Sequence, residues 1–261
     1  MKISVPKKGI FKVAWAADLH CPYQDNKAVE LSEKIVEKYS PDVLILGGDW
    51  IDAVGVSRFS KQPLDPNTNN FQRELDSFQL VLSGFVGAAG KAKKVFLPGN
   101  HEARVGKLLR DRAPALLGLE ALQLPNLLKL SEYGISMIDS VSIGGVVFTH
   151  GDLVRKGSGM SVMAAMESMS YAYSNVIGHC HRMGMVYKSR PGLPPIFGLE
   201  SGHLSDPKKL DYLNGGFMNW QLGMSVVTFV DGIAIPEAVP FYRSNGGLSA
   251  AVPSHFSVLR V

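Results

Sequence analysis

The sequence predicts a layered α/β fold, and three observations support this prediction. Short apolar runs alternate with stretches of helical periodicity through the first half of the chain. Each apolar run ends in a polar turn that carries Asp, Asn or His, and the β-rich second half shows the same kind of turn. Alternating strands and helices are typical of layered α/β proteins, whose ligands gather beyond the carboxyl ends of the strands.

The first half is expected to contain three strands and two helices. The first strand is a short apolar run with β-branched and aromatic members, and the first helix repeats apolar residues at i, i+3 and i+4 until Pro41 stops it. The second strand ends in a double glycine before Asp49. The expected order is strand 11–17, helix 28–39, strand 42–46, helix 71–86 and strand 94–97.

The second half is expected to be mainly strands around one Met- and Ala-rich helix. Asp231-Gly232 is a typical two-residue turn of a β-hairpin. The expected elements are a hairpin-like pair within 135–148, a helix over 159–173, short strands near 176, 185–187 and 196–199, and a hairpin of 224–230 with 233–239. We expect a single domain over 1–241, followed by a Ser- and Gly-rich tail, 242–261, packed as a loose arm.

Composition narrows the possible classes of protein. With 261 residues, 46% hydrophobic and 19% charged, the chain should fold into an ordinary globular core. Two cysteines cannot build a disulfide framework or a zinc finger, and they fit a reducing, cytoplasmic location. No apolar run approaches the ~20 residues of a membrane span, so we expect no membrane contact, and no obligate protein partner is evident. The net charge of +4 comes from scattered Lys and Arg and supports an anionic partner only mildly.

Five of the seven histidines lie in polar turns at predicted strand ends, namely His20, His101, His150, His179 and His181. Side chains at i and i+2 of an extended segment project to the same side, so Asp18 with His20 and His179 with His181 are expected to act as chelating pairs. Imidazole, carboxylate and amide ligands suit Mn, Fe, Zn, Co or Ni. Asp49, presented by a tight glycine turn, could bridge two ions.

The ordered blocks Asp-x-His, Gly-Asp, Gly-Asn-His-Glu, His and Gly-His-x-His resemble the calcineurin-like metallophosphoesterases and run from Asp18 to His181. The resemblance implies a four-layer αββα sandwich with two mixed β-sheets and a centre of two divalent ions, Mn foremost. Such a centre hydrolyses phosphate esters by in-line attack of a metal-bridging hydroxide. Carried over by position, the ligands of the first ion would be Asp18, His20, Asp49 and His181, and those of the second Asp49, Asn100, His150 and His179.

The resemblance also assigns His101 to catalysis, where it would face the substrate phosphate and stabilise charge or protonate the leaving oxygen. Asp52 would orient the His101 ring; a helix N-cap or a solvated carboxylate is the alternative for Asp52. Arg155 and Lys156 are the foremost candidates for binding substrate, because the Gly-Ser-Gly that follows them makes an anion-friendly helix start. Arg58, Arg104 and His203 are weaker candidates for the cleft.

Two departures from the protein Ser/Thr phosphatases of this superfamily bear on the substrate. Those enzymes have Arg-Gly after the second aspartate, whereas Ala53-Val54 follow Asp52 here, and they generally lack the second histidine of Gly-His-x-His. Both differences favour the branch that resembles phosphodiesterases and repair nucleases, including phosphoesterases of bacteriophages, although Glu102 stands where nucleases more often have Asp. We therefore expect a phosphodiesterase acting on a nucleic acid, a nucleotide or a small diester. The alternatives are a phosphomonoesterase, including a phosphoprotein phosphatase, and a catalytically silent binding scaffold.

Overall fold

The computed structural model describes residues 1–57, 70–152, 162–163, 166, 172–210, 218–244, 247–252 and 257–261. Its strands form two mixed sheets. The larger sheet has the order β14-β13-β12-β11-β2-β3-β4-β5, and the smaller has the order β1-β6-β7-β8-β10-β9. The predicted α/β class with two mixed sheets is therefore confirmed.

The larger sheet combines a parallel part with an antiparallel part. The parallel strands are β2 (Ile10–Ala16), β3 (Val43–Leu46), β4 (Lys93–Phe96) and β5 (Ser136–Met137). Antiparallel strands continue from β2 in the order β11 (Gly223–Val230), β12 (Ile233–Ser244), β13 (Gly247–Val252) and β14 (Ser257–Arg260). Val230 pairs with Ile233, so Asp231-Gly232 is the two-residue hairpin turn that the sequence predicts.

The smaller sheet is built from the N-terminus and the middle of the chain. Its strands are β1 (Lys2–Ile3), β6 (Ser140–Ile143), β7 (Val146–Thr149), β8 (Ser174–Ile177), β10 (Leu193–Ser201) and β9 (Met183–Arg190). Strands β7, β8 and β10 run parallel, while β6–β7 and β9–β10 are antiparallel pairs.

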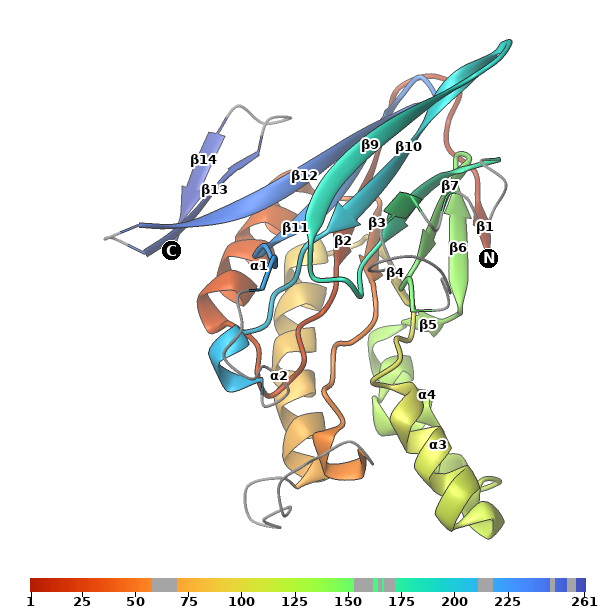
Figure 1. Ribbon diagram of the computed structural model, residues 1–261, viewed down its shortest axis with the longest axis vertical. Helices are drawn as coiled ribbons and strands as arrows, with labels where there is room; N and C mark the ends of the chain where they lie inside the picture. The colour runs from red at the N-terminus through yellow and green to blue at the C-terminus, as the bar shows by residue number, and fades with distance from the viewer. Residues whose placement is uncertain are drawn as a thin grey trace.

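Two long helices, α1 (Asn26–Tyr39) and α2 (Phe71–Ala89), lie next to each other against one face of the larger sheet (Figure 1). The alternation of β2 explains this layer. Ala14 and Ala16 belong to the core cluster shared with the helices. Val13 and Trp15 point the other way, into the core between the two sheets. On the outer face of the smaller sheet, Val162 packs with Ile177, while most of the predicted helix 159–173 lies outside the described residues.

Two parts of the fold differ from expectation. The stretch beyond Tyr242 is not a loose arm, because β13 and β14 add two strands to the edge of the larger sheet and Leu248 and Ala250 are buried. The helix α3 (Ala103–Arg112) was not predicted; it projects away from both sheets (Figure 1), and only Val105 of its residues is buried. The remaining helix, α4 (Leu124–Leu127), is a single turn. Within the described residues, every helix is too short or too polar to span a membrane.

Candidate metal centre

The carboxyl ends of strands from both sheets converge on one site. Loops after β2, β3 and β4 supply Asp18 and His20, Asp49 and Asp52, and Asn100 and His101. Loops after β7 and β8 supply His150, His179 and His181 from the facing sheet. Backbone hydrogen bonds tie neighbouring loops together: His20 N–H donates to the Asp49 carbonyl at 2.9 Å, and Gly178 N–H to the His150 carbonyl at 2.9 Å.

The first cluster consists of Asp18, His20 and His181, all buried. His181 Nε2 lies 3.1 Å from His20 Nε2 and 3.3 Å from Asp18 Oδ1. Burial lowers the pKa of His181 to about 3, so its imidazole is neutral and has a lone pair for a metal. Three ligand atoms of the kinds that bind divalent metals therefore face one point.

The second cluster consists of Asp49, His150 and His179. His150 Nδ1 lies 2.8 Å from the Gly47 carbonyl oxygen, which fixes its proton there and leaves Nε2, 3.1 Å from Asp49 Oδ2, as the ligand atom. Burial alone would raise the pKa of Asp49, but His150 and His101 outweigh it and hold this pKa well below its usual value. Asp49 is therefore an ionised carboxylate.

Unpartnered buried atoms test whether these residues fit a metal. Within the described part of the chain, Asn100 Oδ1 and His179 Nδ1 are buried without a hydrogen-bond partner. Buried polar atoms are nearly always satisfied, so these two call for a ligand. His179 also connects the clusters, because its backbone N–H donates to the Asp18 carboxylate at 2.9 Å. The residues present fit divalent metal ions.

Asp52 lies between two histidines. Its Oδ1 is 2.9 Å from His20 Nδ1 and 3.1 Å from His101 Nδ1, and the two rings are 4.4 Å apart between centroids. A carboxylate on Nδ1 orients an imidazole and leaves Nε2 for the site. The structure thus brings Asp52 and His101 together as the sequence predicts, and it adds His20 as a second ring that Asp52 orients. The solvated-loop alternative for Asp52 is wrong, since only 4% of Asp52 is exposed.

The local backbone differs from the extended pairs that the sequence suggested. Asp18, His20, His179 and His181 all have positive φ, between 53° and 67°, as does Asp49 at 52°. The expectation that His179 and His181 form one chelating pair is wrong, because the left-handed turns send His179 to the second cluster and His181 to the first. That distribution matches the one implied by the family resemblance.

Glu102 holds the loops after β3 and β4 together. Its buried carboxylate accepts hydrogen bonds from the backbone N–H groups of Asp49 at 2.9 Å, Trp50 at 2.7 Å, Ile51 at 3.2 Å and Gly99 at 2.8 Å. The turn between them is tight, and a Cβ on Gly48 would lie 2.8 Å from the Gly99 nitrogen. Glu102 therefore positions Asp49 and Asn100 without facing the clusters itself.

Comparison with known proteins decides the family. Residues 11–173 match the family model of the calcineurin-like phosphoesterases. The chain belongs to this family. It is 28% identical over 88% of its length, and 93% of the relative, to the Gene 54 protein of Mycobacterium phage L5, and 27% identical over the same shares to that of phage D29. A similar solved structure is Vacuolar Protein Sorting 29 from Cryptosporidium parvum, with TM-score 0.48, 12% identity and coverage of 97% of this chain and 99% of that one.

Arg104 and His203, two of the weaker candidates from the sequence, lie in this calcineurin-like site, and Trp220, to which no role was assigned from sequence, joins them. Arg104 donates to the Asp52 carbonyl at 2.7 Å and lies 2.9 Å from His101 Nε2. His203 stacks on His181 at 5.3 Å between centroids, and the Trp220 ring lies 4.0 Å from that of His181. His203 follows β10 just as the other histidines follow their strands, and that position was the signal available in the sequence. Arg155 and Lys156 lie outside the described residues.

Proposed function

We propose that this calcineurin-like protein is a phosphodiesterase with two divalent ions, Mn²⁺ foremost, bound by the two clusters. The observation that carries the proposal is the pair of clusters beside an oriented histidine, His101. Asp18, His20 and His181 would hold one ion, and His150, His179 and Asn100 the other, with Asp49 shared. Divalent ions in such a site supply charge neutralisation for the phosphoryl oxygens and lower the pKa of bound water.

The chain's own residues would bind the phosphate and handle a proton. Burial opposes a charge on His101, but the carboxylates of Asp49 and Asp52 outweigh it and raise its pKa. With a proton on Nε2 in place of the hydrogen bond that this nitrogen accepts from Arg104, His101 could donate to the leaving-group oxygen while Asp52 keeps Nδ1 in place. Arg104 lies beside the same nitrogen, where its guanidinium could contact a phosphate oxygen.

The diester preference is supported by Ala53, which stands where a phosphate-holding arginine would follow Asp52. Arg104, one of the weaker cleft candidates from the sequence, reaches the site from α3. Two of its nitrogens are engaged by the Asp52 carbonyl and His101, so it holds the ring as much as it offers charge to a substrate. A phosphomonoester dianion is the second candidate substrate, and the position of Arg104 beside His101 favours it.

The substrate class that we propose is a nucleic acid or nucleotide, and the location that we propose is the cytoplasm. Excess positive charge supports an anionic partner. Both cysteines are free, which suits a reducing compartment.

The test is hydrolysis of bis-(p-nitrophenyl) phosphate against p-nitrophenyl phosphate, with Mn²⁺ restored after chelation. We expect a higher kcat/KM for the diester at neutral to mildly alkaline pH, and nucleic-acid cleavage that weakens as salt increases. A tenfold preference for the monoester, without cleavage of single-stranded DNA or RNA, would move the assignment to a phosphatase. No hydrolysis of either ester in Mn²⁺ would favour a binding scaffold.

A further inference from the structure

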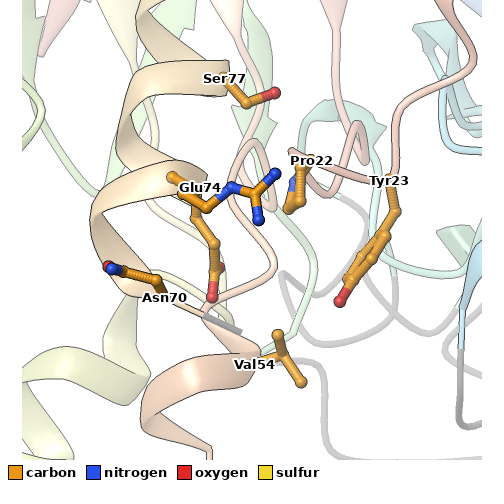
Figure 2. A pocket seen from close by; sticks show the side chains of 7 residues that line it. Pro22, Tyr23, Val54, Asn70, Glu74 and Ser77 are labelled. Carbon is orange, nitrogen blue, oxygen red and sulfur yellow. The ribbon is translucent and has the colours of Figure 1, made fainter. Parts of the chain in front are cut away.

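A cavity lies beside the loops that carry the metal-centre residues, on the side of α2. It has a volume of about 370 Å³, within the range of small-molecule sites. Figure 2 shows Glu74 extending from the first turn of α2 toward Val54, with Pro22 and Tyr23 across the pocket from the helix. Asn70, Arg73 and Ser77 complete the helix side of the lining.

The walls of this cavity belong to the loops that carry the site residues. Tyr23 follows His20 by three residues, and its N–H donates to the His20 carbonyl at 2.6 Å. Val54 follows Asp52 by two residues. At most ~3.6 Å per residue, these spacings place Tyr23 Cα within about 11 Å of His20 Cα. A molecule bound by its phosphate at the metal centre could therefore extend an attached group into the cavity.

Glu74 is the chemical feature that needs a ligand. Only 2% of the residue is exposed. Its Oε1 accepts from Gly55 N–H at 3.0 Å, and its Oε2 has no hydrogen-bond partner among the residues that the structure describes. A buried carboxylate oxygen without a partner is costly, and a donor on a bound molecule would satisfy it. Tyr23 adds an aromatic ring and Pro22 an apolar face, on which a planar group can stack.

We propose that this cavity binds a nucleobase with an exocyclic amino group, which donates to Glu74 Oε2 while the base lies against Tyr23. A carboxylate accepts from the amino group of cytosine, and aromatic side chains stack on bases in single-stranded nucleic acids. The role of the cavity as part of a substrate site rests on the proposed function. Base binding itself requires only the residues of the cavity.

The test uses two free nucleosides, cytidine and uridine. Position 4 of the base carries an amino donor in cytidine and a carbonyl acceptor in uridine, and N3 is an acceptor in cytidine and an N–H donor in uridine. Calorimetric titration at pH 8 is suitable, because burial raises the pKa of Glu74 to about 7 and its carboxyl is then mostly ionised. We expect cytidine to bind roughly tenfold more tightly than uridine. Equal affinities, or no binding of either nucleoside at millimolar concentration, would overturn the proposal.

Variants separate the two contacts. Glu74→Gln keeps an oxygen for Gly55 and replaces the acceptor by a donor, so the preference for cytidine should vanish or invert. Tyr23→Leu should weaken the binding of cytidine and of uridine alike, by roughly tenfold in Kd. The control is Asp76→Asn, an exposed carboxylate on the same helix, which should change neither affinity. An unchanged preference in Glu74→Gln contradicts the proposal; if that variant fails to fold, the wild-type ratio and Tyr23→Leu still decide.

The outcome is independent of catalysis. If the protein prefers cytidine but hydrolyses no phosphodiester, the result supports the base site and contradicts the proposed function. If the protein hydrolyses diesters but shows no preference between the nucleosides, the result supports the proposed function and contradicts the base site.

Discussion

Among the individual residues, Asp49 contacts residues of both clusters and also His101. Its carbonyl accepts from His20 N–H, its Oδ1 accepts from His101 N–H at 2.9 Å, and its Oδ2 lies 3.1 Å from His150 Nε2. It therefore touches a residue of the first cluster, one of the second, and the histidine placed in catalysis. A carboxylate so placed can serve both ions.

If the protein binds two ions as proposed, we expect Asp49→Asn to reduce the metal content from two ions to fewer than one, because an amide keeps the shape but lacks the charge that both ions would share. Elemental analysis after saturation with Mn²⁺ and dialysis measures this. Asp111→Asn, an exposed change on α3, is the control and should leave the stoichiometry unchanged. Retention of one tightly bound ion by Asp49→Asn would show that the shared carboxylate lies elsewhere.

His101→Ala should lower kcat by roughly 10²-fold or more and leave the metal content unchanged, since the role proposed for the ring is at the leaving group rather than on an ion. The loss should be smaller for p-nitrophenyl esters, whose leaving group needs little protonation, than for alkyl esters. Steady-state kinetics on the two ester types, with metal analysis of the same samples, provides the measurement. A variant that loses an ion would make His101 a ligand.

At the scale of elements, the strands and their polar turns were predictable and the precise turn geometry was not. The strands β2, β3 and β4 and the helices α1 and α2 lie within a few residues of their expected positions, because apolar periodicity reports burial. Helix α3 was missed because it is short, half of its residues are charged and it buries only Val105. The left-handed turns were missed because Asp and His are compatible with several backbone conformations, and only the tertiary setting selects one.

The bonding of Glu102 leads to a prediction about two elements, the loops after β3 and β4. In Glu102→Gln one oxygen becomes an amide donor facing backbone N–H groups, so we expect a loss of about 3 kcal/mol in the free energy of unfolding. Metal affinity should fall roughly tenfold or more, because the turns that present Asp49 and Asn100 loosen. Urea denaturation and metal titration measure the two effects, with the exposed change Glu120→Gln as control. A change below about 0.5 kcal/mol would mean that water replaces these bonds easily.

At the scale of the whole molecule, the two sheets place the candidate ligands and the C-terminal strands complete the core beneath α1. The family blocks assign the candidate ligands to two ions, and the two clusters contain the same Asp and His side chains in the same division. The contribution of the last residues was not predictable, because their Ser and Gly content resembles a linker. Leu248 N–H and carbonyl pair with the carbonyl and N–H of Val261 at 2.9 and 2.8 Å, which fixes this end of the chain to β13.

Leu248→Ala should therefore lower the free energy of unfolding of the entire protein by about 3 kcal/mol, because truncation of a buried leucine leaves a cavity. Only 1% of Leu248 is exposed, and it packs in the core cluster that contains α1 and α2. Thermal or urea unfolding measures the loss, and Ser249→Ala, next to it on the same strand, is the control. An effect no larger than that of the control would show that this segment contributes little to stability, as a loosely packed arm would.

The left-handed turns also create a conflict between the stability of the fold and the binding of metal ions. A side chain with a Cβ costs roughly 1 kcal/mol or more at such a backbone position, and glycine avoids that cost. Asp18, His20, Asp49, His179 and His181 all occupy such positions. We expect glycine at Asp18 or His179 to raise the melting temperature of the metal-free protein while removing a ligand; a fall would show that the side-chain hydrogen bonds outweigh the backbone cost. Directed evolution of this chain for heat resistance alone would then select against its chemistry.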